Sequence, residues 1–148
     1  EEIWSYLPHS DSDNSESIFL NQMPEKSGIT FRDEFVKKWE LIYSTRETVN
    51  KALEEKRNEK VIGKSLEANI IIHSGGEMFE KYSQLSDQLA EILIVSGVSV
   101  INDKDGETEF EVVRATGEKC ERCWVYSETV GKDSEHPTLC SRCASVVK

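Results

Sequence analysis

Apolar and polar residues follow two different periods along this chain, and the periods predict a mixture of helices and strands. Between residues 31 and 60, apolar side chains recur at steps of three and four, and neither Gly nor Pro interrupts the run. We therefore expect one long helix, with Thr30 as its N-cap and Gly63 as its end. Its apolar stripe consists of Phe35, Val36, Trp39, Ile42, Tyr43, Val49, Ala52 and Leu53.

The middle of the chain carries both kinds of pattern. An Ile-rich run over residues 66–73 predicts a buried strand, and residues 77–91 return to helical spacing. Two β-rich runs follow, over residues 92–101 and 108–115. Because a turn signal at Asp105-Gly106 separates them, we interpret the two runs as a hairpin. These helices and strands together correspond to an α+β fold class.

The first 30 residues keep neither period. Pro8 and the Ser/Asp run from Ser10 to Ser17 predict a loop, with a short apolar patch at Ile18–Leu20. The chain begins with Glu1 and not with Met, and no leader pattern follows. We therefore expect this chain to be either processed or one piece of a longer polypeptide, and we favour the second.

Composition and charge narrow the class of protein. No stretch reaches the roughly 18 apolar residues of a membrane-spanning helix, and the mean hydropathy of -0.52 predicts a soluble chain. The net charge of -10 argues against a nonspecific nucleic-acid binder. The charge is uneven, however: residues 1–31 carry -5 and residues 65–113 carry -8, while residues 32–64 carry +2 and residues 114–148 carry +1. Nucleic-acid contacts are therefore compatible with the second and fourth segments.

The most specific motif is a pair of Cys-x-x-Cys turns near the C-terminus. Cys120 and Cys123 form the first pair, Cys140 and Cys143 form the second, and sixteen residues separate the pairs. Each turn presents two thiolates to the same ion, so the four predict one tetrahedral, structural zinc site with no open position for water. Two disulfides, a redox motif and an iron centre are the alternatives, and His136 in the intervening loop is a possible substitute ligand.

Aromatic and basic side chains accompany these cysteines. Arg122, Trp124, Tyr126 and Arg142 lie within or beside the two turns. An exposed aromatic ring next to arginines is typical of surfaces that stack bases and contact phosphates. The alternative is that Trp124 packs over the metal site as the hydrophobic body of a very small domain, with the arginines simply solvated. We find no Ser/His/Asp set and no acid–base carboxylate pair, so the sequence predicts no catalytic site.

Four segments together resemble the C-terminal end of bacterial isoleucyl-tRNA synthetases, which are class I aminoacyl-tRNA synthetases. The most specific is Cys120-Glu-Arg-Cys-Trp124, preceded by Ala115-Thr-Gly-Glu-Lys119. The helical stretch from Val49 to Ala68 and the stretch from Leu89 to Ser96 match in the same order. The resemblance covers essentially the whole chain.

The resemblance implies a three-part architecture. Residues 1–65 would end the helical anticodon-binding domain, as long helices that complete its bundle. Residues 66–115 would form a small α+β junction domain, and residues 116–148 a zinc-binding tail with a four-cysteine knuckle.

The resemblance also implies the function. The parent enzyme would attach isoleucine to its tRNA using ATP and magnesium, in the cytoplasm, while this chain holds the anticodon side of the tRNA. The class I signatures His-Ile-Gly-His and Lys-Met-Ser-Lys-Ser are absent, so catalysis would lie upstream. The expected partners are the tRNA for isoleucine and the rest of the synthetase, with no membrane and no DNA. Arg122, Trp124 and Arg142 are the expected tRNA contacts.

Two other functions remain open from the sequence. The first is a zinc-stabilised protein-interaction or structural module that binds no nucleic acid. The second is the zinc tail of a DNA-repair glycosylase, which has similar cysteine spacing.

Overall fold

The computed structural model describes residues 1–23, 25–103 and 106–147, and the chain divides into two compact units, Glu1–Phe35 and Val36–Lys148. The first unit contains two single-turn 3₁₀ helices, η1 (Trp4–Tyr6) and η2 (Ile18–Leu20). The indole nitrogen of Trp4 donates a hydrogen bond to the carbonyl oxygen of Asn14 at 3.1 Å, which ties one end of the unit to its middle.

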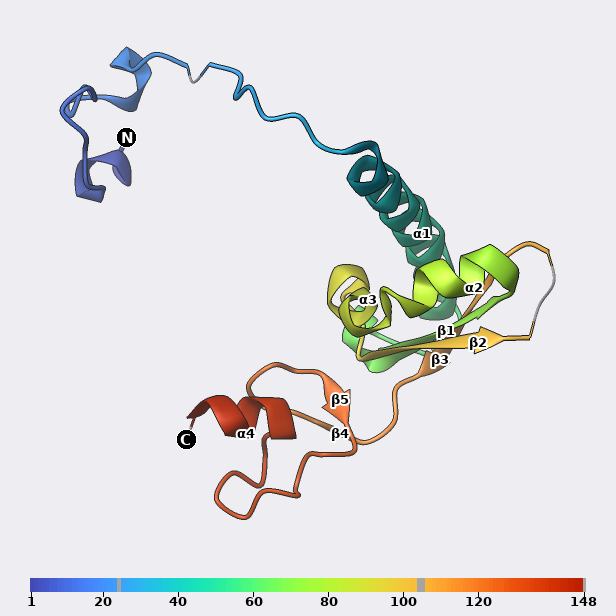
Figure 1. The fold of residues 1–148 in the computed structure, drawn as a ribbon. Helices are drawn as coiled ribbons and strands as arrows, with labels where there is room; N and C mark the ends of the chain where they lie inside the picture. The colour runs from blue at the N-terminus through green and yellow to red at the C-terminus, as the bar shows by residue number, and fades with distance from the viewer. Residues whose placement is uncertain (24, 104–105, 148) are drawn as a thin grey trace. The chain divides into compact units, whose positions relative to one another are not determined.

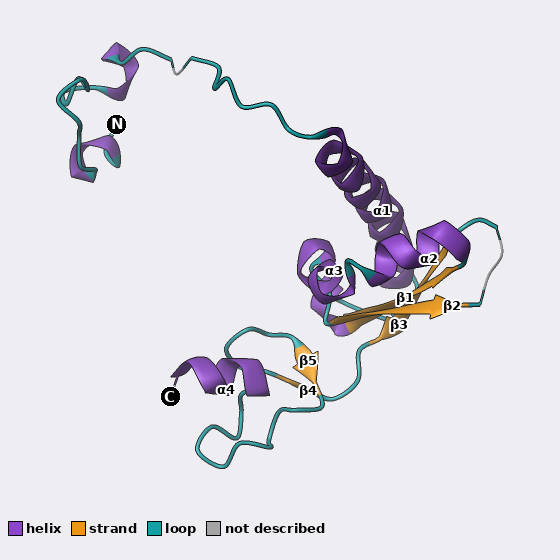
Figure 2. Ribbon diagram, viewed as in Figure 1, coloured by secondary structure: helices purple, strands orange, loops and turns teal. Residues whose placement is uncertain are grey.

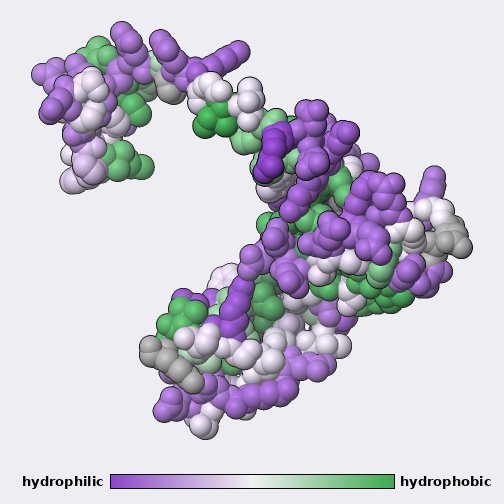
Figure 3. All heavy atoms as spheres, viewed as in Figure 1, coloured by the Kyte–Doolittle hydropathy of each residue, from purple (hydrophilic) through white to green (hydrophobic). Residues whose placement is uncertain are grey.

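Many large apolar side chains of this first unit are exposed to solvent. Phe19 is 84% exposed and Met23 is 88% exposed, and Figure 3 shows hydrophobic residues at the surface of this segment. Ile3, Tyr6, Leu20, Ile29 and Phe31 are exposed as well. Apolar exposure on this scale is typical of a surface that contacts another part of a protein.

The second unit combines a three-stranded sheet, the helices beside it and a small C-terminal module (Figures 1 and 2). The sheet part contains α1 (Asp33–Asn58) from Val36 onward, η3 (Ser65–Glu67), β1 (Ala68–Ser74), α2 (Gly76–Ser83), α3 (Ser86–Leu93), β2 (Gly97–Asn102) and β3 (Glu109–Arg114). The C-terminal module contains β4 (Glu118–Lys119), β5 (Tyr126–Ser127) and α4 (Ser141–Val147). The predicted α+β class is therefore confirmed. Within the described ranges, every helix is too short or too polar to span a membrane.

The sheet has the strand order β2-β1-β3, and the predicted hairpin is wrong. β2 pairs with β1 in parallel, from Asn69↔Gly97 to Ser74↔Asn102, whereas β3 pairs with β1 antiparallel on its other edge. Asp105 of the expected turn lies outside the described residues. β1 takes the centre, so its backbone groups can pair on both edges, and its side chains Ile70 and Ile72 are fully buried. The parallel pairing is possible because α2 and α3 supply the long crossover that it requires.

One hydrophobic core joins the helices to one face of the sheet. Alternate residues of β1 are buried, and their neighbours on the other face are half-exposed. The same core includes the side chains of Ile42, Val49 and Leu53 from α1, at steps that match the predicted stripe. Inside the core, the hydroxyl groups of Thr45 and Tyr82 are 2.8 Å apart and satisfy each other's hydrogen-bonding needs. The start of the stripe is different, because Phe35, Val36 and Tyr43 are exposed.

Two helices end on residues other than glycine in the left-handed conformation. After α1, Lys60 has φ 59°. The amides of Lys60 and Val61 donate to the carbonyls of Arg57 and Lys56, which is a Schellman motif. After α3, Ile94 has φ 58°, and the amides of Ile94 and Val95 donate to the carbonyls of Glu91 and Ala90 in the same way. The predicted end of α1 at Gly63 is therefore too late, and the predicted assignment of Ile94 to a strand is wrong.

The predicted helix over residues 77–91 is two helices. α2 ends at Ser83, and α3 begins at Ser86 with Asp87 in its first turn. An acidic residue near a helix N-terminus favours a new start at this point. The break still lets Tyr82, Leu85 and Leu89 all reach the core, where each is buried.

An imidazole between two carboxylates lies at the open end of the sheet. His73 Nδ1 is 2.9 Å from Asp103 Oδ2, and His73 Nε2 is 3.4 Å from Glu111 Oε2. Hydrogen bonds to Asp103 and Glu111 raise the pKa of His73 above its usual 6.5, against a smaller opposing effect of burial. The protonated imidazole can donate from both nitrogens at once, so the charged form is the one that the site favours.

This arrangement gives stability a dependence on pH. Since the folded-state pKa of His73 is raised, the contribution of His73 to the stability of the fold is complete below the unfolded pKa, near 6.5. This contribution is lost as the pH rises through the folded-state pKa. We expect NMR titration of the His73 ring to give a pKa above 6.5. Asp103→Asn should lower this pKa more than Glu111→Gln does, because Asp103 makes the larger contribution. A wild-type pKa at or below 6.5 would contradict this account.

Candidate metal centre

The four cysteines meet in the C-terminal module. Cys120 and Cys123 lie on the turn after β4, and Cys140 and Cys143 lie at the start of α4. Their four sulfur atoms all lie within 4.8 Å of one another. Zn–S bonds of about 2.3 Å in a tetrahedron separate sulfurs by about 3.8 Å, and Cys123 Sγ is 3.7 Å from Cys140 Sγ. The four side chains are therefore positioned to bind one metal ion.

The disulfide alternative is wrong, because all four cysteines are free. Cys120 and Cys143 are almost completely buried, and Cys140 is 6% exposed. Val130 and Leu139 pack against the sulfurs and complete a small apolar shell around them. His136 is not part of the cluster of metal-ligating groups among the described residues. A closed set of four thiolates with no open coordination position suits a structural ion and not a catalytic one.

The electrostatics of the sulfurs also favour a bound cation. Burial raises the pKa of Cys120, but hydrogen bonds from the backbone amides of Cys123, Cys140 and Arg122 outweigh it and lower this pKa to about 6. Burial and the neighbouring sulfurs raise the pKa of Cys140 to about 12. The Cys120 thiolate is thus readily formed, while Cys140 resists ionisation beside it. A divalent cation removes this conflict, because it stabilises every thiolate that binds to it.

Two arginines offset the negative charge of the sulfur cluster. Arg122 Nη1 donates to Cys143 Sγ at 3.7 Å. A hydrogen bond to Cys123 raises the pKa of Arg142, and Arg142 Nη1 also donates to Glu91 Oε1 at 2.8 Å. Zinc with four thiolates carries a net charge of about -2, so two adjacent guanidinium groups compensate it. Both side chains remain exposed, so each is also open to a ligand.

Trp124 does not pack over the metal site, contrary to one of the two alternatives drawn from the sequence. Its side chain is 55% exposed, and the cluster around the sulfurs excludes it. The backbone of Trp124 has φ 67°, in the left-handed region that favours glycine, and its amide donates to the carbonyl of Cys120 at 2.9 Å. This conformation costs an L-residue roughly 1–2 kcal/mol. The backbone of Trp124 adopts this conformation despite its cost, and the indole ring is exposed to solvent.

Two lysines lie close to this ring. Neither is among the site residues predicted from the sequence. Lys119 Nζ is 5.1 Å from the centroid of the Trp124 ring, and Lys64 Nζ is 5.9 Å from it. Lys119 directly precedes Cys120, which is a local signal that could have been used. Lys64 lies 60 positions before Trp124, and no pattern in the sequence connects the two.

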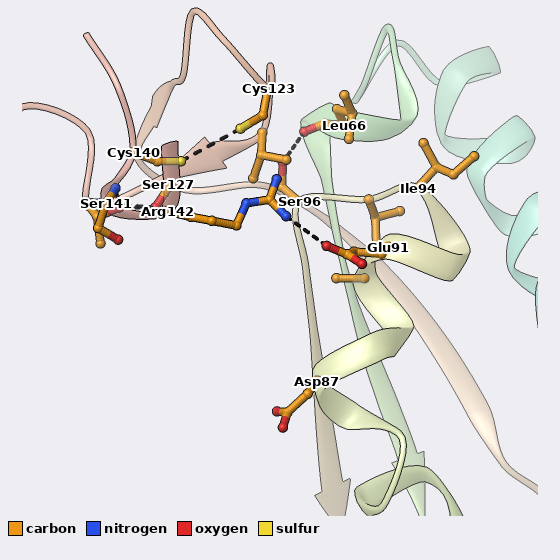
Figure 4. A pocket seen from close by; sticks show the side chains of 14 residues that line it. Leu66, Asp87, Glu91, Ile94, Ser96, Cys123, Ser127, Cys140, Ser141 and Arg142 are labelled. Carbon is orange, nitrogen blue, oxygen red and sulfur yellow. Dashed lines mark hydrogen bonds and ion pairs between the residues drawn. The ribbon is translucent and has the colours of Figure 1, made fainter. Parts of the chain in front are cut away.

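Ser96 joins the cysteine module to the sheet. Its hydroxyl group donates to the carbonyl of Leu66 and accepts a hydrogen bond of 2.8 Å from the amide of Tyr126, while its own amide donates to the carbonyl of Ala68. Figure 4 shows Ser96 between these segments, with Arg142 reaching across to Glu91 beside it. Two contacts therefore hold the module to the sheet part: Tyr126 with Ser96, and Arg142 with Glu91. An open cavity of about 610 Å³ lies along this junction.

Comparisons with known proteins agree with this geometry. Residues 117–146 match the family described as a zinc finger found in FPG and IleRS. The whole chain is similar to the isoleucine–tRNA ligase of Bacillus mycoides (strain KBAB4), with 43% identity over 157 residues. The corresponding ligases of Bacillus cereus strains B4264 and AH820 are 43% and 42% identical over the same length. Each comparison covers 100% of this chain but only 17% of the relative, in its C-terminal region.

Proposed function

We propose that this chain, which is similar over its whole length to the C-terminal region of bacterial isoleucine–tRNA ligases, is the tRNA-binding end of such an enzyme. Its zinc holds the C-terminal module together, with Cys120, Cys123, Cys140 and Cys143 as the ligands. The parent enzyme attaches isoleucine to its tRNA with ATP and magnesium in the cytoplasm, and its catalytic residues lie in the part that this chain does not contain. The similarity spans the sheet and helices as well as the finger, which favours a ligase over a DNA-repair glycosylase.

The domain limits stay part of the proposal. Residues 1–65 would end the anticodon-binding domain, residues 66–115 would form the junction domain, and residues 116–148 would form the zinc tail. The exposed apolar side chains of residues 1–35 support a partner surface on the first unit, and those of the first half of α1 support one on the second unit. We assign each surface to contacts with the remainder of the synthetase.

The observation that carries the tRNA proposal is the exposure of Trp124. A core residue would pack over the sulfurs, but Val130 and Leu139 fill that position and the indole ring projects into solvent. Unpaired bases of RNA loops stack on exposed aromatic side chains of this kind. Arg122 and Arg142 lie in the same module with exposed side chains, so they can contact phosphates near such a base.

Replacing Trp124 tests this proposal. In the full-length, zinc-loaded protein, Trp124→Ala should weaken binding of the cognate tRNA transcript by about 5- to 150-fold, since stacking of one base contributes about 1–3 kcal/mol. Filter binding measures the affinity, and zinc content is measured in parallel. Val146→Ala is the matched control, because Val146 is an exposed apolar residue of the same module.

Arg142→Ala should weaken tRNA binding as well. If Trp124→Ala and Arg142→Ala both leave tRNA affinity and aminoacylation unchanged while zinc is retained, the tRNA proposal is wrong. The chain would then be a zinc-stabilised interaction or structural module, for which the exposed apolar surface of residues 1–35 is the favouring observation.

A further inference from the structure

Two ammonium groups lie beside the exposed ring of Trp124, and they come from different parts of the chain. Lys64 lies between α1 and η3, whereas Lys119 is the last residue of β4 in the cysteine module. Their Nζ atoms are 5.9 Å and 5.1 Å from the ring centroid, close enough for a cation–π contact. Both side chains are exposed to solvent.

Three lysines of α1 and α2 are neutralised by nearby carboxylates. Lys51 pairs with Glu47 at 3.4 Å, Lys56 with Glu59 at 2.7 Å, and Lys81 with Glu77 at 2.8 Å. Among the described residues, neither Lys64 nor Lys119 forms an ion pair. In a chain with a net charge of -10, two unneutralised ammonium groups beside one exposed ring form a local positive site.

The junction at Ser96 holds the two lysines near the ring. The Ser96 hydroxyl group accepts a hydrogen bond from the amide of Tyr126, two residues after Trp124. It also donates to the carbonyl of Leu66, two residues after Lys64. One side chain thus connects the backbone segments that carry Lys64 and Trp124. Lys119 pairs with Tyr126 across β4 and β5, so it belongs to the same connected set.

We propose that Lys64 and Lys119 bind the two phosphates that flank a single unpaired nucleotide of tRNA whose base stacks on Trp124. This inference rests on the proposed function and adds two binding residues and a ligand class to it. A nucleotide within a strand has a phosphate on each side of its sugar, so a base on the ring brings two phosphates to its edges. An exposed cation–π contact is weaker than base stacking, so the lysine side chains leave the ring face for the phosphates when a base arrives.

The salt dependence of tRNA binding tests this proposal, because it counts phosphate contacts. Each contact to a single strand contributes about 0.7 to the slope of log K against log salt concentration. In the full-length, zinc-loaded protein with a cognate tRNA transcript, Lys64→Ala and Lys119→Ala should each reduce the slope by about 0.7. The double variant should reduce it by about 1.4. Lys64→Arg and Lys119→Arg should keep the wild-type slope, since the charge is retained.

Lys132→Ala is the matched control, because Lys132 is an exposed lysine of the same module for which no contact with the Trp124 ring is found. It should leave the slope unchanged. If wild-type protein binds tRNA and the double variant keeps the wild-type slope, the lysine proposal is wrong while the tRNA proposal stands. An equal loss of slope in Lys132→Ala would also overturn the lysine proposal, because removing any lysine of the module would then have the same effect on tRNA binding. If wild-type protein does not bind tRNA, both proposals fall.

Discussion

Removal of the zinc ion should unfold residues 117–146 and leave α1 through β3 folded. The module has almost no core apart from its sulfurs: the buried residues are Cys120, Cys140, Cys143 and Ala144, with Val130 and Leu139 partly buried against them. A segment of this size cannot offset its conformational entropy by burying apolar surface alone. Structural zinc supplies about 10–16 kcal/mol in comparable peptides, so its loss should remove the fold of the module.

The sheet should survive because it does not depend on the metal. Its core contains Ile70, Ile72 and Leu89 together with α1 residues, and the hydrophobic cluster that they form includes no residue of the cysteine module. Hydrogen exchange after chelation should show lost amide protection across residues 117–146 and retained protection in β1, α3 and the second half of α1. Readdition of zinc should restore the protection, and Cys143→Ser should reproduce the loss without a chelator. Retained protection in the module after chelation would contradict this prediction.

The second large effect should come from one methyl group at Gly117. Gly117 has φ 83°, and a Cβ atom at this position would lie 2.3 Å from the carbonyl carbon of Ser127 and 2.5 Å from the amide nitrogen of Glu128. Both are backbone atoms, at the last residue of β5 and the residue after it, so no side-chain rotation relieves the clash. Gly117→Ala should therefore separate β4 from β5 and destabilise the module by more than about 3 kcal/mol.

Gly131 offers a control with the same backbone conformation and no clash. Its φ is 84°, and the nearest atom to a Cβ would be 3.8 Å away. Gly131→Ala should destabilise the module by only roughly 1–2 kcal/mol, which is the cost of holding an alanine in the left-handed conformation. Denaturation of the zinc-loaded protein, followed by hydrogen exchange in the module, measures both variants. Equal losses of stability would mean that strand β5 moves aside and that the close approach at Gly117 is not a constraint.

The wrong predictions have one cause in common: the sequence pattern does not say which distant segments of the chain pack together. The β-rich runs that became β2 and β3 fit a hairpin as well as two edges of β1, because a strand pattern does not say which strand lies beside it. The helix over residues 77–91 failed for a similar reason, since both a continuous and a broken helix keep the apolar positions on one side. Lys60 and Ile94 end helices in the left-handed conformation, which a sequence pattern leads one to expect only at glycine. These two helix ends are therefore visible only in the backbone of the structure.

The sequence by itself determined the metal site and the long helix. Each Cys-x-x-Cys turn is local, so two residues of spacing already place both sulfurs, and the apolar stripe of α1 depends only on the helical period. The tertiary structure alone decided three other features: the order β2-β1-β3, the junction at Ser96 and the position of Lys64 beside Trp124. Lys64 and Trp124 are 60 positions apart, and their contact depends on how β1 and the cysteine module pack together. That packing follows from the buried surface of the whole unit, which no local pattern encodes.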